Sequence, residues 1–113
     1  MNSGRLADLV SFQEPEVERD ADGQLIQGYV ERFKAWAHVR HLRGGESVMA
    51  ARMQSRSPAI LTIRNSAAAR AVTSEWRAVV RDRTGIERVY EMREDPRPTD
   101  GSGFLEMLAE SGA

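Results

Sequence analysis

The two histidines are the first groups in this sequence that could bind a metal ion. His38 and His41 stand three positions apart, and the chain has no other histidine. On a β-strand this spacing puts the two imidazoles on opposite faces, where they cannot share a metal. On a helix they would lie together, but no third ligand stands out nearby. We therefore expect ordinary surface histidines and no metal site.

Carboxylates are plentiful, but they stand where acid–base catalysis is not expected. Glu14, Glu16 and Glu18 alternate in a segment that contains a proline, and Glu94 and Asp95 are adjacent. Both groups fall in predicted loops, where no burial would raise a pKa into the range that general acid–base catalysis uses. A solvated acidic loop is the better interpretation of each group.

Neither the serines nor the glycines form a known catalytic or phosphate-binding motif. The serines at positions 47, 55, 57 and 66 lack the G-x-S-x-G context of a nucleophile elbow. The R-G-G-E-S run at 43–47 has neither the spacing nor the lysine of a phosphate-binding loop. The chain has no cysteine, which excludes thiol catalysis, thiolate metal sites and disulfides. We expect no enzyme activity and no cofactor.

Length and charge limit the function further. The chain has 113 residues, enough for one domain that buries roughly two-thirds of the surface its unfolded chain exposes. Its 16 basic and 17 acidic residues give a net charge of −1, which argues against a dedicated nucleic-acid-binding protein. Lys34 is the only lysine; a GC-rich genome explains the many arginines, which also suit interface ion pairs. No signal peptide and no membrane-spanning run is predicted.

Alternating apolar residues predict an all-β fold of about six short strands. The predicted strands cover residues 6–13, 29–42, 59–64, 76–81 and 86–95, and residues 104–110 form a sixth strand or a short helix. Turn-forming residues separate them at the spacing of a small β-protein. The expected fold class is a small antiparallel β-barrel or sandwich, with one short helix and two long loops.

The longest predicted strand, residues 29–42, has two distinct faces. One parity carries apolar residues such as Phe33 and Val39, and the other carries charged residues and Trp36. This pattern is typical of a strand with one buried face. A helix is the rival interpretation, because alanine, glutamate and lysine favour helices. Aromatic and β-branched residues within the segment favour the strand.

The two predicted loops lie at about residues 14–28 and 43–58. The first is acidic and contains an Asp22-Gly23 turn signal, so it is a long hairpin connection or an arm. The second starts at Gly44 and Gly45, which break the strand, and continues with residues that favour two turns of helix. So short a helix is marginal alone and must pack on something else. A connection at 65–75 is expected to hold one helical turn.

The two tryptophans raise an alternative function. Trp36 and Trp76 lie on predicted strands beside arginines and could stack bases, as in a small single-strand nucleic-acid-binding module of the OB or SH3-like type. The competing interpretation is that they pack at a barrel rim under arginine stems. The near-zero net charge favours packing. A small enzyme or ligand-binding barrel is less favoured still, because no catalytic motif is present.

Several segments, in their order along the chain, resemble the tailed-phage head–tail joining proteins, also called head-closure, stopper or adaptor proteins. The opening SGRLADLVSFQEP is similar to the first strand of that family. The stretch DADGQLIQGYVERFKAWAHVRHLRGGESVMAARMQS resembles its Asp-Gly turn, its tryptophan-bearing strand and its short helix. The segments ILTIR, WRAVVRDRTGIERVYEM and FLEMLAE resemble the closing strands. The resemblance covers nearly the whole chain, although each signature is short.

The resemblance implies a structural protein of the virion rather than an enzyme. Such a subunit forms a closed ring of about six or twelve copies between the portal or adaptor protein of the capsid and the tail terminator or tail tube protein. The ring retains the packaged double-stranded DNA without reading its sequence, and it offers the tail a surface to attach to. Gene transfer agents carry similar proteins. The expected location is the connector of a phage or phage-like particle that is made in the bacterial cytoplasm, with no membrane contact.

A ring subunit needs arms that reach its neighbours, and the two predicted loops are the candidates. Their charges are opposed, so we expect the acidic loop of one copy to contact the arginines of the next. In the second loop Gly44 and Gly45 would be the hinge, with valine and methionine as a docking face. The predicted interface residues are Glu14, Glu16, Glu18, Arg43, Gly44, Gly45, Glu46, Val48, Met49, Arg52, Met53 and Arg56.

Overall fold

The computed structural model describes residues 6–42, 56–99 and 103–112 of the chain, without the side chain of Arg56. Seven strands and one short helix occur in these residues. They are β1 (Asp8–Arg19), β2 (Leu25–His41), β3 (Arg56–Arg64), α2 (Ala67–Arg70), β4 (Arg77–Arg81), β5 (Glu87–Met92), β6 (Arg97–Pro98) and β7 (Phe104–Gly112). The part of the sequence predicted to form a hinged helix, 43–55, lies outside the described residues.

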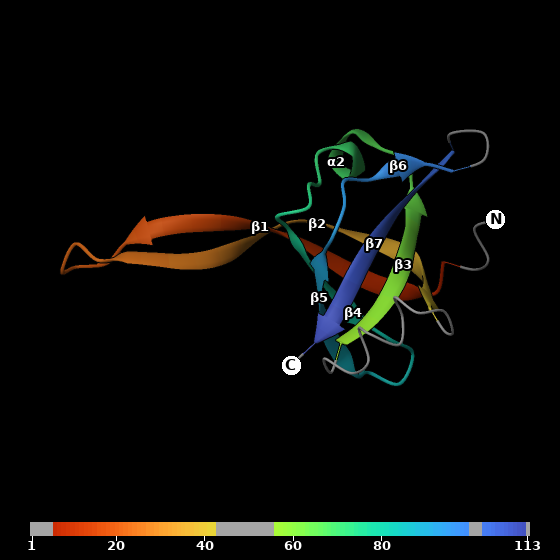
Figure 1. Ribbon diagram of the computed structural model, residues 1–113, viewed down its shortest axis with the longest axis horizontal. Helices are drawn as coiled ribbons and strands as arrows, with labels where there is room; N and C mark the ends of the chain where they lie inside the picture. Colours follow the sequence, from red (N-terminus) through yellow and green to blue (C-terminus); the bar gives the residue numbers. More distant parts are fainter. Residues whose placement is uncertain (1–5, 43–55, 100–102, 113) are drawn as a thin grey trace.

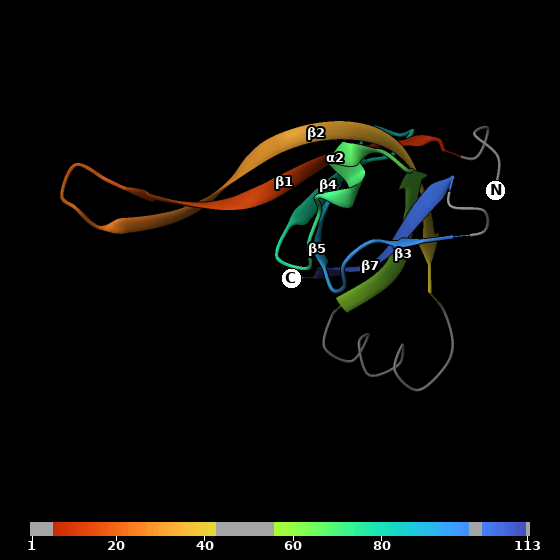
Figure 2. The same ribbon diagram turned by 90° about the horizontal axis from the view of Figure 1, so that it is seen from above.

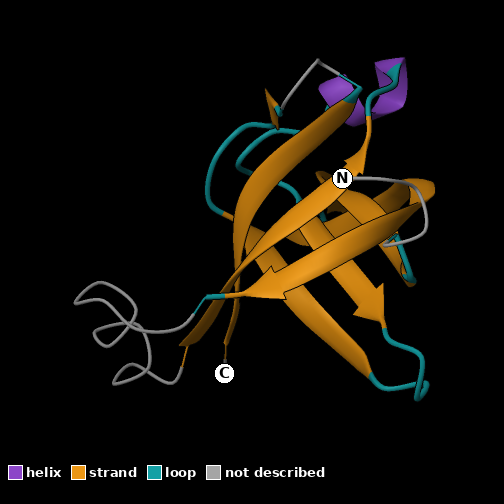
Figure 3. Ribbon diagram, turned by 90° about the vertical axis from the view of Figure 1, so that its right-hand side faces the viewer, coloured by secondary structure: helices purple, strands orange, loops and turns teal. Residues whose placement is uncertain are grey.

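The strands form one antiparallel sheet that closes on itself. Their order is β3-β2-β1-β4-β5-β7-β6, and an additional pairing of β3 with β7 joins the two sides. Six strands therefore form a barrel, while the two-residue β6 pairs only with β7 (Figures 1 and 3). The predicted all-β barrel with one short helix is confirmed.

Strand alternation fills the barrel with apolar side chains. Phe12 of β1 and Leu61 of β3 are fully buried, and Tyr90 of β5 is almost so. Burial raises the pKa of the Tyr90 phenol above its ordinary value. The buried core is made of Val10, Phe12, Ala37, Ala59, Leu61, Ile63, Ala69, Val72, Trp76, Ala78, Val80, Tyr90, Met92, Leu105, Met107 and Ala109.

The predicted faces of the longest strand are confirmed. Phe33 and Val39 of β2 pack against the core, whereas Lys34 and Trp36 are exposed. The rival helix is wrong, because β2 pairs with β1 over its whole length and with β3 at its end. Those ladders satisfy the backbone hydrogen-bonding groups that a helix would satisfy internally.

The predicted loop at 14–28 is wrong in its conformation. Residues up to Arg19 continue β1, and β2 already starts at Leu25, so that only a tight turn lies between them. The carboxylate of Asp20 accepts hydrogen bonds from the backbone N–H groups of Asp22 and Gln24, both at 2.9 Å, and Gly23 has a φ of 80°. Glutamate and proline suggested a loop, but a two-stranded ribbon exposes both faces and tolerates polar residues there.

The remaining connections agree with the sequence more closely. The expected helical turn within 65–75 is α2, whose first turn is capped by the Ser66 hydroxyl, which accepts the Ala69 N–H at 3.0 Å. The turn after β4 is closed by Asp82. A hydrogen bond from the Thr84 hydroxyl, followed by backbone N–H bonds, lowers the pKa of that carboxyl. Residues 104–110 belong to a strand, β7, rather than a helix.

Phe12 provides a test of the packing at the point where β1 leaves the barrel. Its ring is fully buried and stacks on Phe33 with 4.8 Å between the ring centroids. Phe12→Ala is expected to lower the free energy of unfolding by about 3–5 kcal/mol, because it removes apolar contacts and leaves a cavity. Urea unfolding measures the change. Val17→Ala, at a position 59% exposed on the same strand, should change it by less than about 0.5 kcal/mol. Similar losses in both variants would contradict the assigned core.

Candidate assembly surface

Strands β1 and β2 extend beyond the barrel as a two-stranded projection. The pairing of β1 with β4 ends at Gln13, and the pairing of β2 with β3 starts only at Ala37. Residues 14–31, which we call the ribbon, therefore pair only with each other, except that Glu31 pairs with Gln13 at the root (Figures 1 and 2). The ribbon accounts for the elongated shape of the molecule, whose principal extents are 49 × 36 × 27 Å.

A β-bulge marks the place where the ribbon leaves the barrel. Phe12 pairs with Phe33, but the next residue, Gln13, pairs with Glu31, so Arg32 is an extra residue in β2. A bulge bends its strand and increases the local twist, which redirects the two strands away from the barrel wall. The extra residue is held by an ion pair, in which the Arg32 Nε donates to the Glu14 carboxylate at 2.8 Å.

Arg77 joins the root of the ribbon to the barrel. This residue of β4 places its guanidinium carbon 4.0 Å from the centre of the Tyr29 ring, a cation–π contact with β2. Its Nε also donates to the Gln13 side-chain oxygen on β1 at 2.6 Å. One side chain of the barrel therefore contacts both strands of the ribbon and orients its base.

The two faces of the ribbon differ in chemistry. Directly paired residues share a face, so the three predicted glutamates lie together with Val30, Gly28 and Ile26, which pair with Glu14, Glu16 and Glu18. The opposite face carries Pro15, Val17, Arg19, Leu25, Gln27 and Tyr29. Val17, Leu25, Ile26 and Tyr29 are exposed apolar or aromatic side chains. In the described part of the chain, Val17, Leu25 and Ile26 stay more than half exposed.

Charge is divided unequally between the ribbon and the rest of the chain. Residues 14–31 contain six acidic side chains and one basic side chain, a net charge of −5. The other fifteen basic and eleven acidic residues give the remainder a net charge of +4. The balanced total therefore hides an acidic projection on a basic body, which favours contact between the ribbon of one copy and the body of another.

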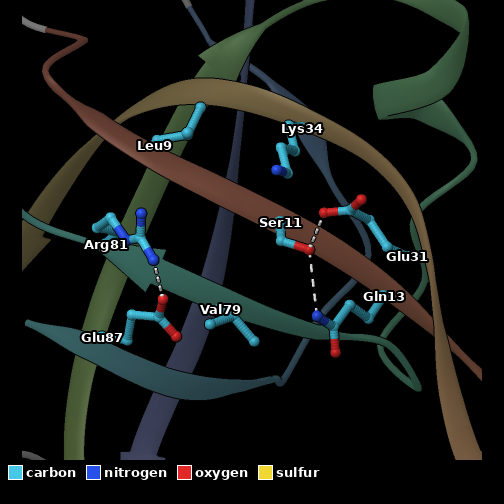
Figure 4. Close-up of a pocket in the computed structure, with 8 residues that line it drawn as sticks. All are labelled: Leu9, Ser11, Gln13, Glu31, Lys34, Val79, Arg81 and Glu87. Carbon is cyan, nitrogen blue, oxygen red and sulfur yellow. Dashed lines mark hydrogen bonds and ion pairs between the residues drawn. The ribbon is translucent and has the colours of Figure 1, made fainter.

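A hollow on the outer barrel wall near the ribbon root has polar groups that pair with one another (Figure 4). The Ser11 hydroxyl donates to Glu31 at 2.6 Å, the Gln13 amide donates to Ser11 at 3.1 Å, and Arg81 pairs with Glu87. Within the described ranges, no cluster of three or more histidine or acidic side chains could hold a metal.

The structure brings together only part of the predicted interface. The three glutamates share the ribbon face, whereas Arg43, Gly44, Gly45, Glu46, Val48, Met49, Arg52 and Met53 lie outside the described residues. Arg56 starts β3, where its backbone pairs with Gly112. Sequence reasoning missed Tyr29 and Arg77, although the uncharged, β-prone residues from Leu25 to Val30 signalled that a strand starts before residue 29.

The tryptophans do not form a base-stacking platform. Trp36 points outward from β2 and is 56% exposed, whereas Trp76 is 6% exposed and belongs to the core. A single exposed tryptophan beside an acidic ribbon gives no support to the alternative of a single-strand nucleic-acid-binding module. In the described part of the chain, no helix is long and apolar enough to cross a membrane.

A sequence profile of the phage head completion proteins matches residues 1–112. The chain belongs to the phage head completion protein family. It is accordingly a structural protein of the virion, and the resemblance to head–tail joining proteins is confirmed at this level.

Two solved structures share the fold of this head completion protein. The solution structure of protein SF1141 from Shigella flexneri 2a matches with a TM-score of 0.71 and 22% identity, over 100% of this chain and 98% of the other. A chain in the virion of a native gene transfer agent particle matches with a TM-score of 0.60 and 21% identity, over 93% of both chains. No curated protein matches the chain.

The contact between Arg77 and Tyr29 can be tested by substitution. Tyr29→Ala removes the ring under the guanidinium and should cost about 0.5–1 kcal/mol of local stability, which corresponds to amide exchange about two to five times faster at residues 28–31. Tyr29→Phe keeps the ring and should leave the exchange rates close to the original. Hydrogen-exchange NMR provides the measurement. Equal exchange in both variants would show that Arg77 does not hold the ribbon.

Proposed function

We propose that this protein forms a closed ring between the portal or adaptor protein of the capsid and the terminator or tube protein of the tail. The ring has six or twelve copies, retains the packaged DNA and provides the tail attachment surface. Family membership supports the head completion role. The observation that carries the ring is the ribbon, a long projection with apolar side chains that stay exposed in the described part of the chain.

The energetics of the ribbon support this role. A two-stranded hairpin is marginally stable by itself, and Ile26, which lies on the same face as the glutamates, is more than half exposed. Burying such side chains against a neighbour stabilises both the ribbon and the assembly. The barrel body is closed, so contacts between copies run from ribbon to body rather than from sheet edge to sheet edge. Such heterologous contacts generate a ring when the rotation between copies closes.

Opposed charges suggest how adjacent copies are matched. The acidic face with Glu14, Glu16 and Glu18 contacts the basic body of the next copy, which includes segment 43–58. That segment contributes the charges of Arg43, Glu46, Arg52 and Arg56, the apolar contacts of Val48, Met49 and Met53, and the hinge at Gly44 and Gly45. Packaged DNA lies near the channel without sequence-specific contacts, since the projecting ribbon is acidic.

Deleting the gene from its particle-producing host tests the function as a whole. We expect DNA-filled heads and separate tails, because the joining surface is missing, and electron microscopy of the lysate distinguishes these from complete particles. Supplying the gene in trans should restore joining. Complete, infectious or transfer-competent particles formed without the protein would refute the proposed function.

Charge reversal on the ribbon tests the ring contact separately. Glu16→Lys combined with Glu18→Lys is expected to weaken assembly about tenfold or more, because two attractive contacts with the neighbour become repulsive. Native mass spectrometry of the purified protein measures the fraction in rings. The control combines Glu75→Lys with Glu91→Lys, at exposed positions of the barrel, and should leave assembly nearly unchanged. Unchanged rings in the ribbon variant would contradict the contact.

A further inference from the structure

Neither long edge of the ribbon is paired with a further strand among the described residues. On the side away from β2, residues Glu14–Arg19 of β1 have no partner strand among the described residues. On the side away from β1, residues 25–36 of β2 have none either. An open strand edge presents unpaired N–H and C=O groups, and proteins usually protect such edges against other strands.

The β1 edge carries that protection. Pro15 has no backbone N–H, so this edge lacks a donor at its position. Glutamates at every second residue, from Glu14 to Glu18, add charge along the same strand. Proline and charge are the usual means by which an edge strand resists the addition of another strand. The β1 edge is therefore closed to strand addition.

The β2 edge carries no such protection. From Leu25 to Val30 the strand reads L-I-Q-G-Y-V, with no charged residue and no proline, and leucine, isoleucine, tyrosine and valine suit a β-strand. Uncharged, β-prone segments of this length are the ones that readily add a further strand. Leu25 and Ile26 are also 66% and 51% exposed, so their side chains leave the edge accessible.

The register shows which backbone groups are available. Pro15 is paired with Tyr29, and a residue without an N–H cannot belong to a hydrogen-bonded antiparallel pair. The N–H and C=O groups of Tyr29 therefore point away from β1. Pair types alternate along the ladder, so the corresponding groups of Gln27 and Leu25 point the same way. Leu25, Gln27 and Tyr29 thus each offer an N–H donor and a C=O acceptor on the open edge of β2.

We propose that the open β2 edge, Leu25–Val30, binds an extended segment of a different virion protein, which adds to the ribbon as a third strand. The inference rests on the proposed function, since it names the kind of partner that this joining subunit attaches. Main-chain hydrogen bonds between the added strand and β2 would provide affinity, as in other cases of strand addition. Apolar residues line both faces of the edge strand, so the added strand is apolar at alternate positions.

Charge decides against a second copy of the chain as the occupant. Pairing two ribbons along their β2 edges would place two projections of net charge −5 side by side. Pairing the β2 edge of one copy with the β1 edge of the next would meet Pro15 and the glutamates. The added segment is therefore from another protein. Because the ribbon is acidic, we expect lysine or arginine rather than acidic residues in or beside that segment.

Hydrogen exchange read by mass spectrometry can follow this edge in three samples: the monomer, the ring of the pure protein and the complete particle. Within peptides covering 25–30, we expect the N–H groups of Leu25, Gln27 and Tyr29, which point away from β1, to exchange quickly in the monomer and the ring. In the particle these three groups should exchange about a hundredfold more slowly, because they donate to the partner strand. Protection already present in the ring would make a second copy the occupant and overturn the proposal. Rapid exchange in the particle would overturn it as well.

A matched pair of proline substitutions adds a test of function. Gln27 and Val17 are directly paired, and each has its N–H on an outer edge of the ribbon. Gln27→Pro should abolish head–tail joining and the particle-specific protection, whereas Val17→Pro should leave both intact. Rings of normal mass from both variants confirm that the fold and the ring survive. Equal loss of joining in both variants would refute the edge assignment. Absence of the protein from complete particles would instead refute the proposed function.

Discussion

The pairing of β3 with β7 is the constraint on which the rest of the structure depends. It runs from Arg56 opposite Gly112 to Arg64 opposite Phe104 and turns a twisted sheet into a closed barrel. Closure pairs the backbone hydrogen-bonding groups of β3 and β7 and leaves few open strand edges in the barrel wall. The long open edges in the described residues are consequently those of the ribbon. In the described residues, the ribbon rather than the closed barrel wall therefore offers long edges to which another strand could add.

The ribbon is positioned by contacts at its root rather than along its length. The bulge at Phe12 and Gln13 redirects the strands, the stacked phenylalanines lie in and against the core, and Arg77 contacts both strands from the barrel. Beyond this point the ribbon has no further support from the described part of the chain. A rigid root with an unsupported tip presents its exposed side chains at a defined distance from the body, while the tip gains stability only by binding.

The two ribbon edges differ in charge. Glutamates and Pro15 occupy β1, whereas Leu25–Val30 of β2 is uncharged. In the arrangement we propose, the acidic face contacts the basic body of the next copy, and the open β2 edge remains for a different protein. A single hairpin thereby separates self-assembly from attachment. The same net charge of −1 would have been obtained with mixed charges throughout, but without that separation.

The sequence by itself determined the strand faces and the tight turns. Alternation of Phe33 and Val39 with Lys34 and Trp36 was enough to orient β2, and Asp22-Gly23 marked the tip of the hairpin, because these properties depend on neighbours within a few residues. Only the tertiary structure decided that residues 14–19 and 25–28 are strands and that Arg77 contacts Tyr29. Those outcomes depend on register between segments far apart in the chain. A glutamate-rich segment with a proline lacks a local strand signal, and it becomes a strand because residues 25–31 supply its backbone partners.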